Sequence, residues 1–287
     1  MGIVERVADW REQGVRFWES IRDTWVGRLL ERIVRDLARL EVFDRAMTLA
    51  AQAFTSIVPL MLVASTLRPQ HPGFGSIVAD SLGLSDETRA SLAGAVPASA
   101  TALGSIGFFS IVVAIFSATS FSRALERVYL RTWDVPKPSV RTAWRWLVVI
   151  LAVIVAVLVI AFTKSALSGA IWADVLVAVF QTVVWTAVWT VVPWLLLQRQ
   201  VAPRVLVWTA ALTAVCMGVL GVAGGIYLPI VMESGAHQFG ILGLVFAYIG
   251  WLFAIALVIV ATTVIGRACA ESDGPLGRVV RGAPTPA

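Results

Sequence analysis

A polar stripe within an apolar segment is the first feature of this sequence that could carry chemistry. Residues 50–62 read AAQAFTSIVPLML, and Gln52, Thr55, Ser56 and Pro59 fall on one face if the segment is helical. Proline cannot donate the backbone hydrogen bond that continues a helix, so Pro59 predicts a kink. In lipid, amide and hydroxyl groups need partners. The stripe therefore either forms hydrogen bonds between helices or lines a groove along which a substrate passes.

A second polar group occurs in the segment GVAGGIYLPIVMESGAHQFGILG at residues 221–243. Its adjacent glycines and Pro229 predict that a membrane helix is broken here, as in transporters whose interrupted helices line substrate sites. Tyr227, Glu233 and His237 would then gather at the outer mouth of the same path. This interpretation makes them candidate substrate-path residues.

The same residues do not indicate an enzyme. His71 and His237 are the only histidines, and both fall in connections between apolar segments, so we expect no metal site. The sequence has no glycine-rich phosphate loop with a lysine and no acidic pair within an apolar segment. We therefore expect no catalytic residues and no cofactor.

A basic connection at residues 123–145 raises the question of nucleic acid, because its arginines could neutralise phosphates. Membrane topology explains the same cluster without RNA, since cytoplasmic connections are rich in Arg and Lys. Hydrolysis of RNA would also need a metal or a positioned acid and base, which we cannot assemble from this sequence. We expect no nucleic-acid partner.

Small residues recur at spacings that favour close packing of membrane helices. Glycine lets two helix backbones approach each other. The glycines that we assign to helix packing are Gly107, Gly221, Gly225, Gly243 and Gly250.

The elements that must position these residues follow from composition. The chain has 287 residues, of which 58% are hydrophobic and 14% charged, and its mean hydropathy is +0.82. A helix needs about 20 mostly apolar residues to cross a bilayer. Segments of this kind predict an all-α, polytopic membrane protein with six transmembrane helices. The predicted spans are residues 46–67, 102–122, 146–163, 173–197, 205–227 and 240–265.

The distribution of basic residues predicts the orientation. Arg and Lys are frequent before the first span, between spans two and three, and after the last span, and are sparse in the alternate connections. The positive-inside rule therefore places both termini in the cytoplasm. We divide the chain into an amphipathic helical cytoplasmic segment (1–45), a six-span bundle (46–266) and a disordered cytoplasmic tail rich in Gly and Pro (267–287).

Three segments together resemble the YihY/virulence factor BrkB family of bacterial inner-membrane proteins. They read FDRAMTLAAQAFTSIVPLMLVAS, FSRALERVYLRTWDVPKPSVRTAWRWLVVI and GILGLVFAYIGWLFAIALVIV, in that order along the chain. The resemblance covers residues 35–266. It implies six spans, cytoplasmic termini and a location in the bacterial plasma membrane. The family once carried the label ribonuclease BN, which is generally regarded as mistaken.

Two functions remain after this reasoning. The first is movement of a lipid or solute of the bacterial envelope along the polar first span and the interrupted fifth. The second is a non-catalytic scaffold that recruits envelope or division proteins through the amphipathic segment before the first span. Membrane lipids are the expected partners, with a second copy of the chain or an envelope protein as further ones.

Overall fold

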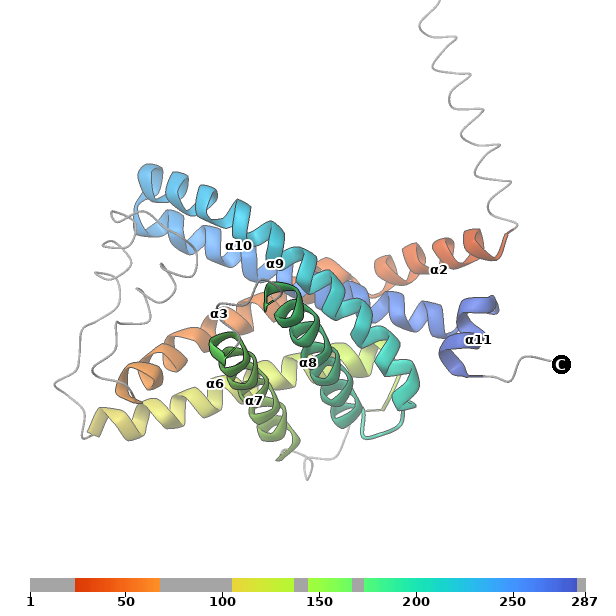
Figure 1. The fold of residues 1–287 in the computed structure, drawn as a ribbon, viewed down its shortest axis with the longest axis horizontal. Helices are drawn as coiled ribbons and strands as arrows, with labels where there is room; N and C mark the ends of the chain where they lie inside the picture. The colour runs from red at the N-terminus through yellow and green to blue at the C-terminus, as the bar shows by residue number, and fades with distance from the viewer. Residues whose placement is uncertain (1–23, 68–104, 137–143, 167–172, 283–287) are drawn as a thin grey trace, which may run out of the picture.

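The computed structural model describes residues 24–67, 105–136, 144–166 and 173–282, and their regular elements are eight helices. Helices are expected in apolar segments because a helix satisfies its backbone hydrogen bonds internally. The helices, labelled as in Figure 1, are α2 (Trp25–Arg39), α3 (Val42–Leu67), α6 (Ser105–Thr132), α7 (Trp144–Ala166), α8 (Ala173–Leu196), α9 (Pro203–Phe239), α10 (Ile241–Ala270) and α11 (Pro275–Arg281).

Helix α10 lies at the centre of the arrangement. It makes its most extensive contacts with α9 and α3 and also contacts α2, α6 and α11. The main core lies where α3, α6, α8 and α10 meet, and Leu49, Tyr129, Leu196 and Val260 are among its fully buried side chains. The last helix of the bundle therefore holds together helices from both ends of the chain.

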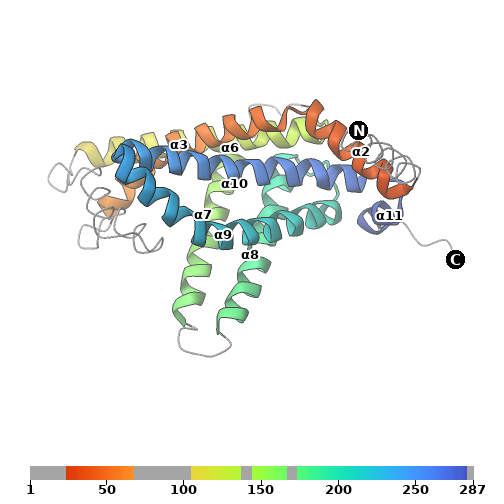
Figure 2. The same cartoon turned by 90° about the horizontal axis from the view of Figure 1, so that it is seen from above.

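Helices α7 and α8 form a pair that projects from the rest of the molecule. Figure 2 shows the two leaving the layer of α3, α6 and α10 side by side. Their apolar side chains are largely exposed, as at Leu147, Leu158, Val175 and Val183. Apolar surface on this scale is unfavourable in water and is the surface that lipid tails would cover.

Three of the described helices are long and apolar enough to cross a membrane: Val175–Leu196, Pro203–Phe239 and Leu242–Glu271. A shorter apolar helix covers Trp144–Ile160. Helices α3, α6 and α7 lie at the positions of the three other predicted spans. The all-helical prediction is confirmed for the described residues, and the number of six spans stays a prediction.

The predicted break in the fifth span does not occur. Helix α9 continues without interruption from Pro203 to Phe239, with Pro229 inside it. The outer-mouth residues therefore belong to the last turns of one long helix instead of a loop. A break would leave backbone groups without partners in an apolar environment, whereas a helix loses one hydrogen bond at a proline.

The tail after residue 267 also differs from its prediction. Helix α10 continues to Ala270, and a short helix, α11, follows where disorder was expected. Arg281 donates to the backbone oxygens of Ala270 and Ser272, and Val280 is buried. A few arginine contacts and one apolar side chain thus order a segment whose Gly and Pro content suggested a flexible chain.

Candidate functional site

The polar stripe of α3 faces helix α6. Gln52 Oε1 accepts a hydrogen bond of 2.7 Å from Ser120 Oγ. The hydroxyl of Ser56, which is buried, lies 3.0 Å from the backbone oxygen of Ser117 and 2.7 Å from that of Gln52, so it can donate to either helix. This is the arrangement expected of hydrogen bonding between helices.

The other members of the stripe behave differently. Thr55 is exposed and donates only within α3, to the backbone oxygens of Ala51 and Gln52. Pro59 lies within α3 and Gly107 within α6, but their surroundings fall outside the described part of the structure. The structure thus brings Gln52 and Ser56 together with α6 and leaves Thr55 on the surface.

An open apolar groove lies between the second half of α9 and the first half of α10, with a volume of about 720 Å³. Tyr227, Ser234 and Gln238 supply its polar side chains, and none of the described residues that line it is charged. Glu233 and His237 lie on the same helix but do not line the groove. Of the three predicted mouth residues, Tyr227 alone lines this groove.

Two close contacts hold α9 and α10 together along this groove. A Cβ atom on Gly224 would collide with the indole ring of Trp251, and one on Gly243 would collide with the backbone of Gly235. At Gly243 the obstacle is backbone, so only glycine fits there, whereas a larger residue at Gly224 would require the indole ring of Trp251 to move.

Among the predicted packing glycines whose surroundings are described, Gly243 makes such a contact, while Gly221, Gly225 and Gly250 have open space where a Cβ would be. Gly250 lines the groove. The sequence does contain a pattern that marks the face of α9 that packs against α10. The residues of α9 that face α10 recur every three to four positions: Gly224, Leu228, Met232 and Gly235.

Sequence reasoning missed a buried acid at the meeting of α6 and α7. Glu126 is only 6% exposed, and its Oε2 accepts a 2.9 Å hydrogen bond from Trp146 Nε1. Among the described residues, neither its Oε1 nor the Nε of Arg145 has a hydrogen-bond partner. Burial raises the pKa of Glu126, and the Trp146 hydrogen bond with the charges of Arg145 and Arg127 opposes part of that rise.

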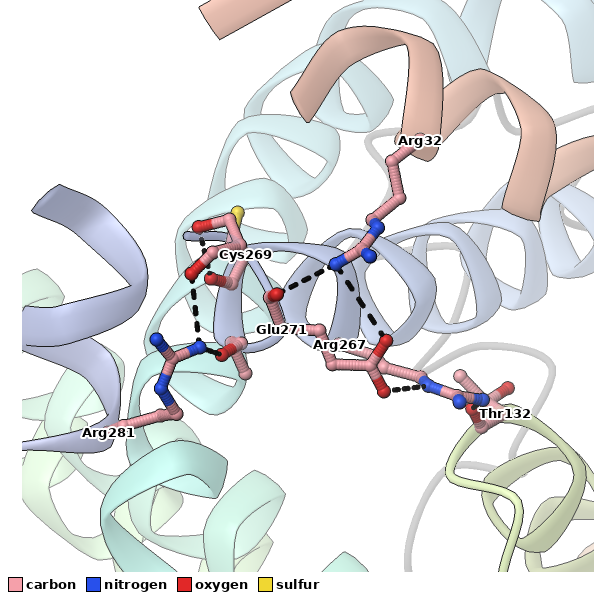
Figure 3. Close-up of polar contacts among 8 residues, drawn as sticks. Arg32, Thr132, Arg267, Cys269, Glu271 and Arg281 are labelled. Carbon is pink, nitrogen blue, oxygen red and sulfur yellow. Dashed lines mark hydrogen bonds and ion pairs between the residues drawn. The ribbon is translucent and has the colours of Figure 1, made fainter. Parts of the chain in front are cut away.

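A charged junction lies at the end of α10, where α2, α6 and α11 approach it (Figure 3). Arg267 donates through Nε to Glu271 Oε1 at 2.7 Å and through Nη1 to the backbone oxygen of Thr132, the last residue of α6. Arg32 of α2 donates to the backbone oxygen of Glu271 at 2.7 Å. Arginine is favourable at a helix C-terminus because it satisfies carbonyls left without partners.

No group of His, Cys, Asp and Glu in the described residues is arranged to hold a metal ion. The groove between α9 and α10 is suited to an apolar ligand, and the arginines of the charged junction are suited to an anion.

The long apolar helices and their exposed faces define an all-helical membrane protein. Comparison with protein families then places it more closely: the chain belongs to the virulence factor BrkB family, whose model matches residues 33–277. The resemblance noted in the sequence is thereby confirmed. Neither a curated protein nor a solved structure gives a significant match to this chain.

Proposed function

We propose that this protein is a multi-pass protein of the bacterial plasma membrane, with both termini in the cytoplasm, that moves lipid through the groove between α9 and α10. The groove is the observation that carries the proposal. Its volume of about 720 Å³ lies within the range of roughly 300–1,000 Å³ typical of ligand pockets.

The lining favours a lipid over a water-soluble solute. Most of its side chains are apolar, with a few polar groups along α9. Tyr227, Phe239 and Phe246 line it and are also largely exposed, so the groove opens toward the surroundings of the helices. An acyl chain entering from the bilayer would meet apolar side chains, whereas a charged solute would lose its hydration without gaining partners.

The test fills the groove without disturbing its walls. Gly250 lines the groove, so Gly250→Phe places a ring inside it. Gly221 does not line the groove, so Gly221→Phe places the same ring in open space outside it. Both changes replace a helical glycine, so both alter helix propensity equally. In proteoliposomes, we expect the native chain to speed the transbilayer movement of a fluorescent phospholipid, Gly250→Phe to slow it several-fold, and Gly221→Phe to match the native chain.

Equal rates for the two variants would contradict a role of the groove. A native chain that does not change the rate above empty liposomes would contradict lipid movement itself.

A scaffold role is the second candidate, and one observation favours it. Val26, Leu30 and Val34 recur every four residues on α2 and are exposed, so they form an apolar stripe on its surface. Leu30→Gln with Val34→Gln should then remove the envelope proteins that copurify with the full chain. If the same proteins copurify in the same amounts, α2 does not recruit them.

A further inference from the structure

We propose that the cavity between the ends of α2, α6 and α10 binds a phosphate group. This cavity, called the junction cavity below, has a volume of about 260 Å³. Five arginines line it, namely Arg32, Arg35, Arg39, Arg131 and Arg267. It lies at the opposite end of α10 from the apolar groove, so the proposal does not rest on lipid movement.

The charges of the junction cavity do not cancel. Asp36, Asp134 and Glu271 are its acidic residues, so five guanidinium groups face three carboxylates. Glu271 is already engaged by two of the arginines, since Arg267 Nε lies 2.7 Å from its Oε1 and Arg32 Nη1 lies 4.0 Å from its Oε2. An excess of positive charge in a confined space attracts an anion.

The contacts of each arginine show which of them could hold a ligand. Arg267 donates to the backbone oxygen of Thr132, and Arg32 donates to the backbone oxygen of Glu271. Arg35 donates to Glu31 at 2.8 Å. These three have structural roles that would keep them in place without a ligand.

Arg39 and Arg131 differ from them. Both are exposed, both line the junction cavity, and neither makes a hydrogen bond or ion pair with any other described residue. They come from α2 and α6, which are far apart in the sequence. Two such guanidinium groups at one cavity supply donors whose planar geometry matches the oxygens of a phosphate.

The lining of the cavity differs between its buried and its exposed parts. Leu40 and Val264 line it and are buried, while the exposed Arg39 and Arg131 lie on its accessible side. A phosphate bound there has two sources, the headgroup of an anionic lipid in the adjacent leaflet or phosphate free in solution. Basic pockets near helix ends bind anionic headgroups by the same electrostatic attraction.

The experiment compares two double variants that remove equal charge. Arg39→Gln with Arg131→Gln alters the junction cavity, while Arg127→Gln with Arg278→Gln removes two exposed arginines outside it, one of them one turn from Arg131. Each full-length chain is titrated in detergent with short-chain phosphatidylglycerol, short-chain phosphatidylcholine and inorganic phosphate, and binding is measured by native mass spectrometry and calorimetry. Circular dichroism checks that each variant is folded.

We expect the native chain and the Arg127/Arg278 variant to bind a phosphate-bearing anion equally, and the Arg39/Arg131 variant to bind it at least tenfold more weakly. Binding of phosphatidylglycerol over phosphatidylcholine identifies a lipid headgroup, and binding of inorganic phosphate with equal strength identifies a free phosphate. The proposal is overturned if the native chain binds neither anion, if it does not distinguish the two lipids and ignores phosphate, or if both double variants bind as the native chain does.

Discussion

At the scale of single residues, Ser56 illustrates how a polar group is accommodated in an apolar helix. Its hydroxyl lies within hydrogen-bond distance of one carbonyl in its own helix and one in α6. Thr55, its neighbour in sequence, stays on the surface and bonds only within α3. Two adjacent hydroxyls that look alike in the sequence therefore have different energetic roles.

We expect Ser56→Ala to lower the free energy of unfolding by about 1 kcal/mol, because interhelical hydrogen bonds in membrane proteins contribute roughly 0.6–2 kcal/mol. Thr55→Val is the matched control and should change it by less than about 0.5 kcal/mol, as is usual at surface positions. Unfolding in detergent with increasing denaturant measures both. A larger loss for Thr55→Val than for Ser56→Ala would contradict this assignment.

Glu126 gives the molecule a pH dependence whose sign follows from burial. Because burial raises the pKa of Glu126 above its ordinary value of 4.5, the folded chain binds more protons than the unfolded chain just above that pH. Stability from this group is therefore present at lower pH and is lost as pH rises from about 4.5 through the raised pKa.

Glu126→Gln should remove this dependence, since glutamine keeps an acceptor for Trp146 Nε1 and does not titrate. We expect its melting temperature to vary less between pH 4.5 and 7 than that of the native chain and to be higher at pH 7. Glu41→Gln, at an exposed position, is the control and should follow the native curve. If the melting temperatures of Glu126→Gln and the native chain change with pH in parallel, the carboxyl of Glu126 is not the source of the pH dependence.

At the scale of elements, the pairing of α9 with α10 depends on where glycine falls on each helix. The backbones of Gly235 and Gly243 approach so closely that a side chain on Gly243 would meet a carbonyl group that cannot move aside without moving α9. Gly250, two turns further along α10, faces the open groove. The two glycines therefore have opposite consequences when replaced.

Gly243→Ala should destabilise the chain by about 1–3 kcal/mol, the usual cost of overpacking. Gly250→Ala should stabilise it by up to about 1 kcal/mol, because alanine is the better helix former and meets no neighbour. Thermal unfolding in detergent compares the two. If both substitutions act in the same direction by similar amounts, the close backbone contact does not determine the packing of this pair.

At the scale of the whole molecule, the connection between α9 and α10 and the end of α11 are expected on opposite sides of the membrane. Alkaline phosphatase fused after Gly240 should be active, because this enzyme needs the periplasm. A green fluorescent protein fused after Ala287 should fluoresce, because it folds in the cytoplasm. As the control, the two reporters are exchanged, and both should then be inactive. If the exchanged reporters are active instead, the orientation that the basic residues predict is wrong.

Much of this architecture could be predicted from the sequence because hydropathy is a local property. Each predicted span overlaps a helix, although α6 and α9 extend well past the predicted ends. The contacts between helices could not be predicted in the same way. The hydrogen bond from Arg267 to Thr132 joins residues 135 positions apart. A periodic pattern within one segment gives no information on such a contact. Gly225, which the sequence suggested for helix packing, has open space beside it, whereas its neighbour Gly224 meets Trp251 of α10.

The uninterrupted length of α9 has a consequence for the membrane around it. Its 37 residues correspond to about 55 Å at a rise of about 1.5 Å per residue, whereas the hydrocarbon core of a bilayer is about 30 Å thick. A helix of this length that crosses the bilayer would have to tilt steeply, extend past the lipid or deform the bilayer, and each response is a form of hydrophobic mismatch. In that arrangement, the length of the surrounding acyl chains would set the tilt of α9.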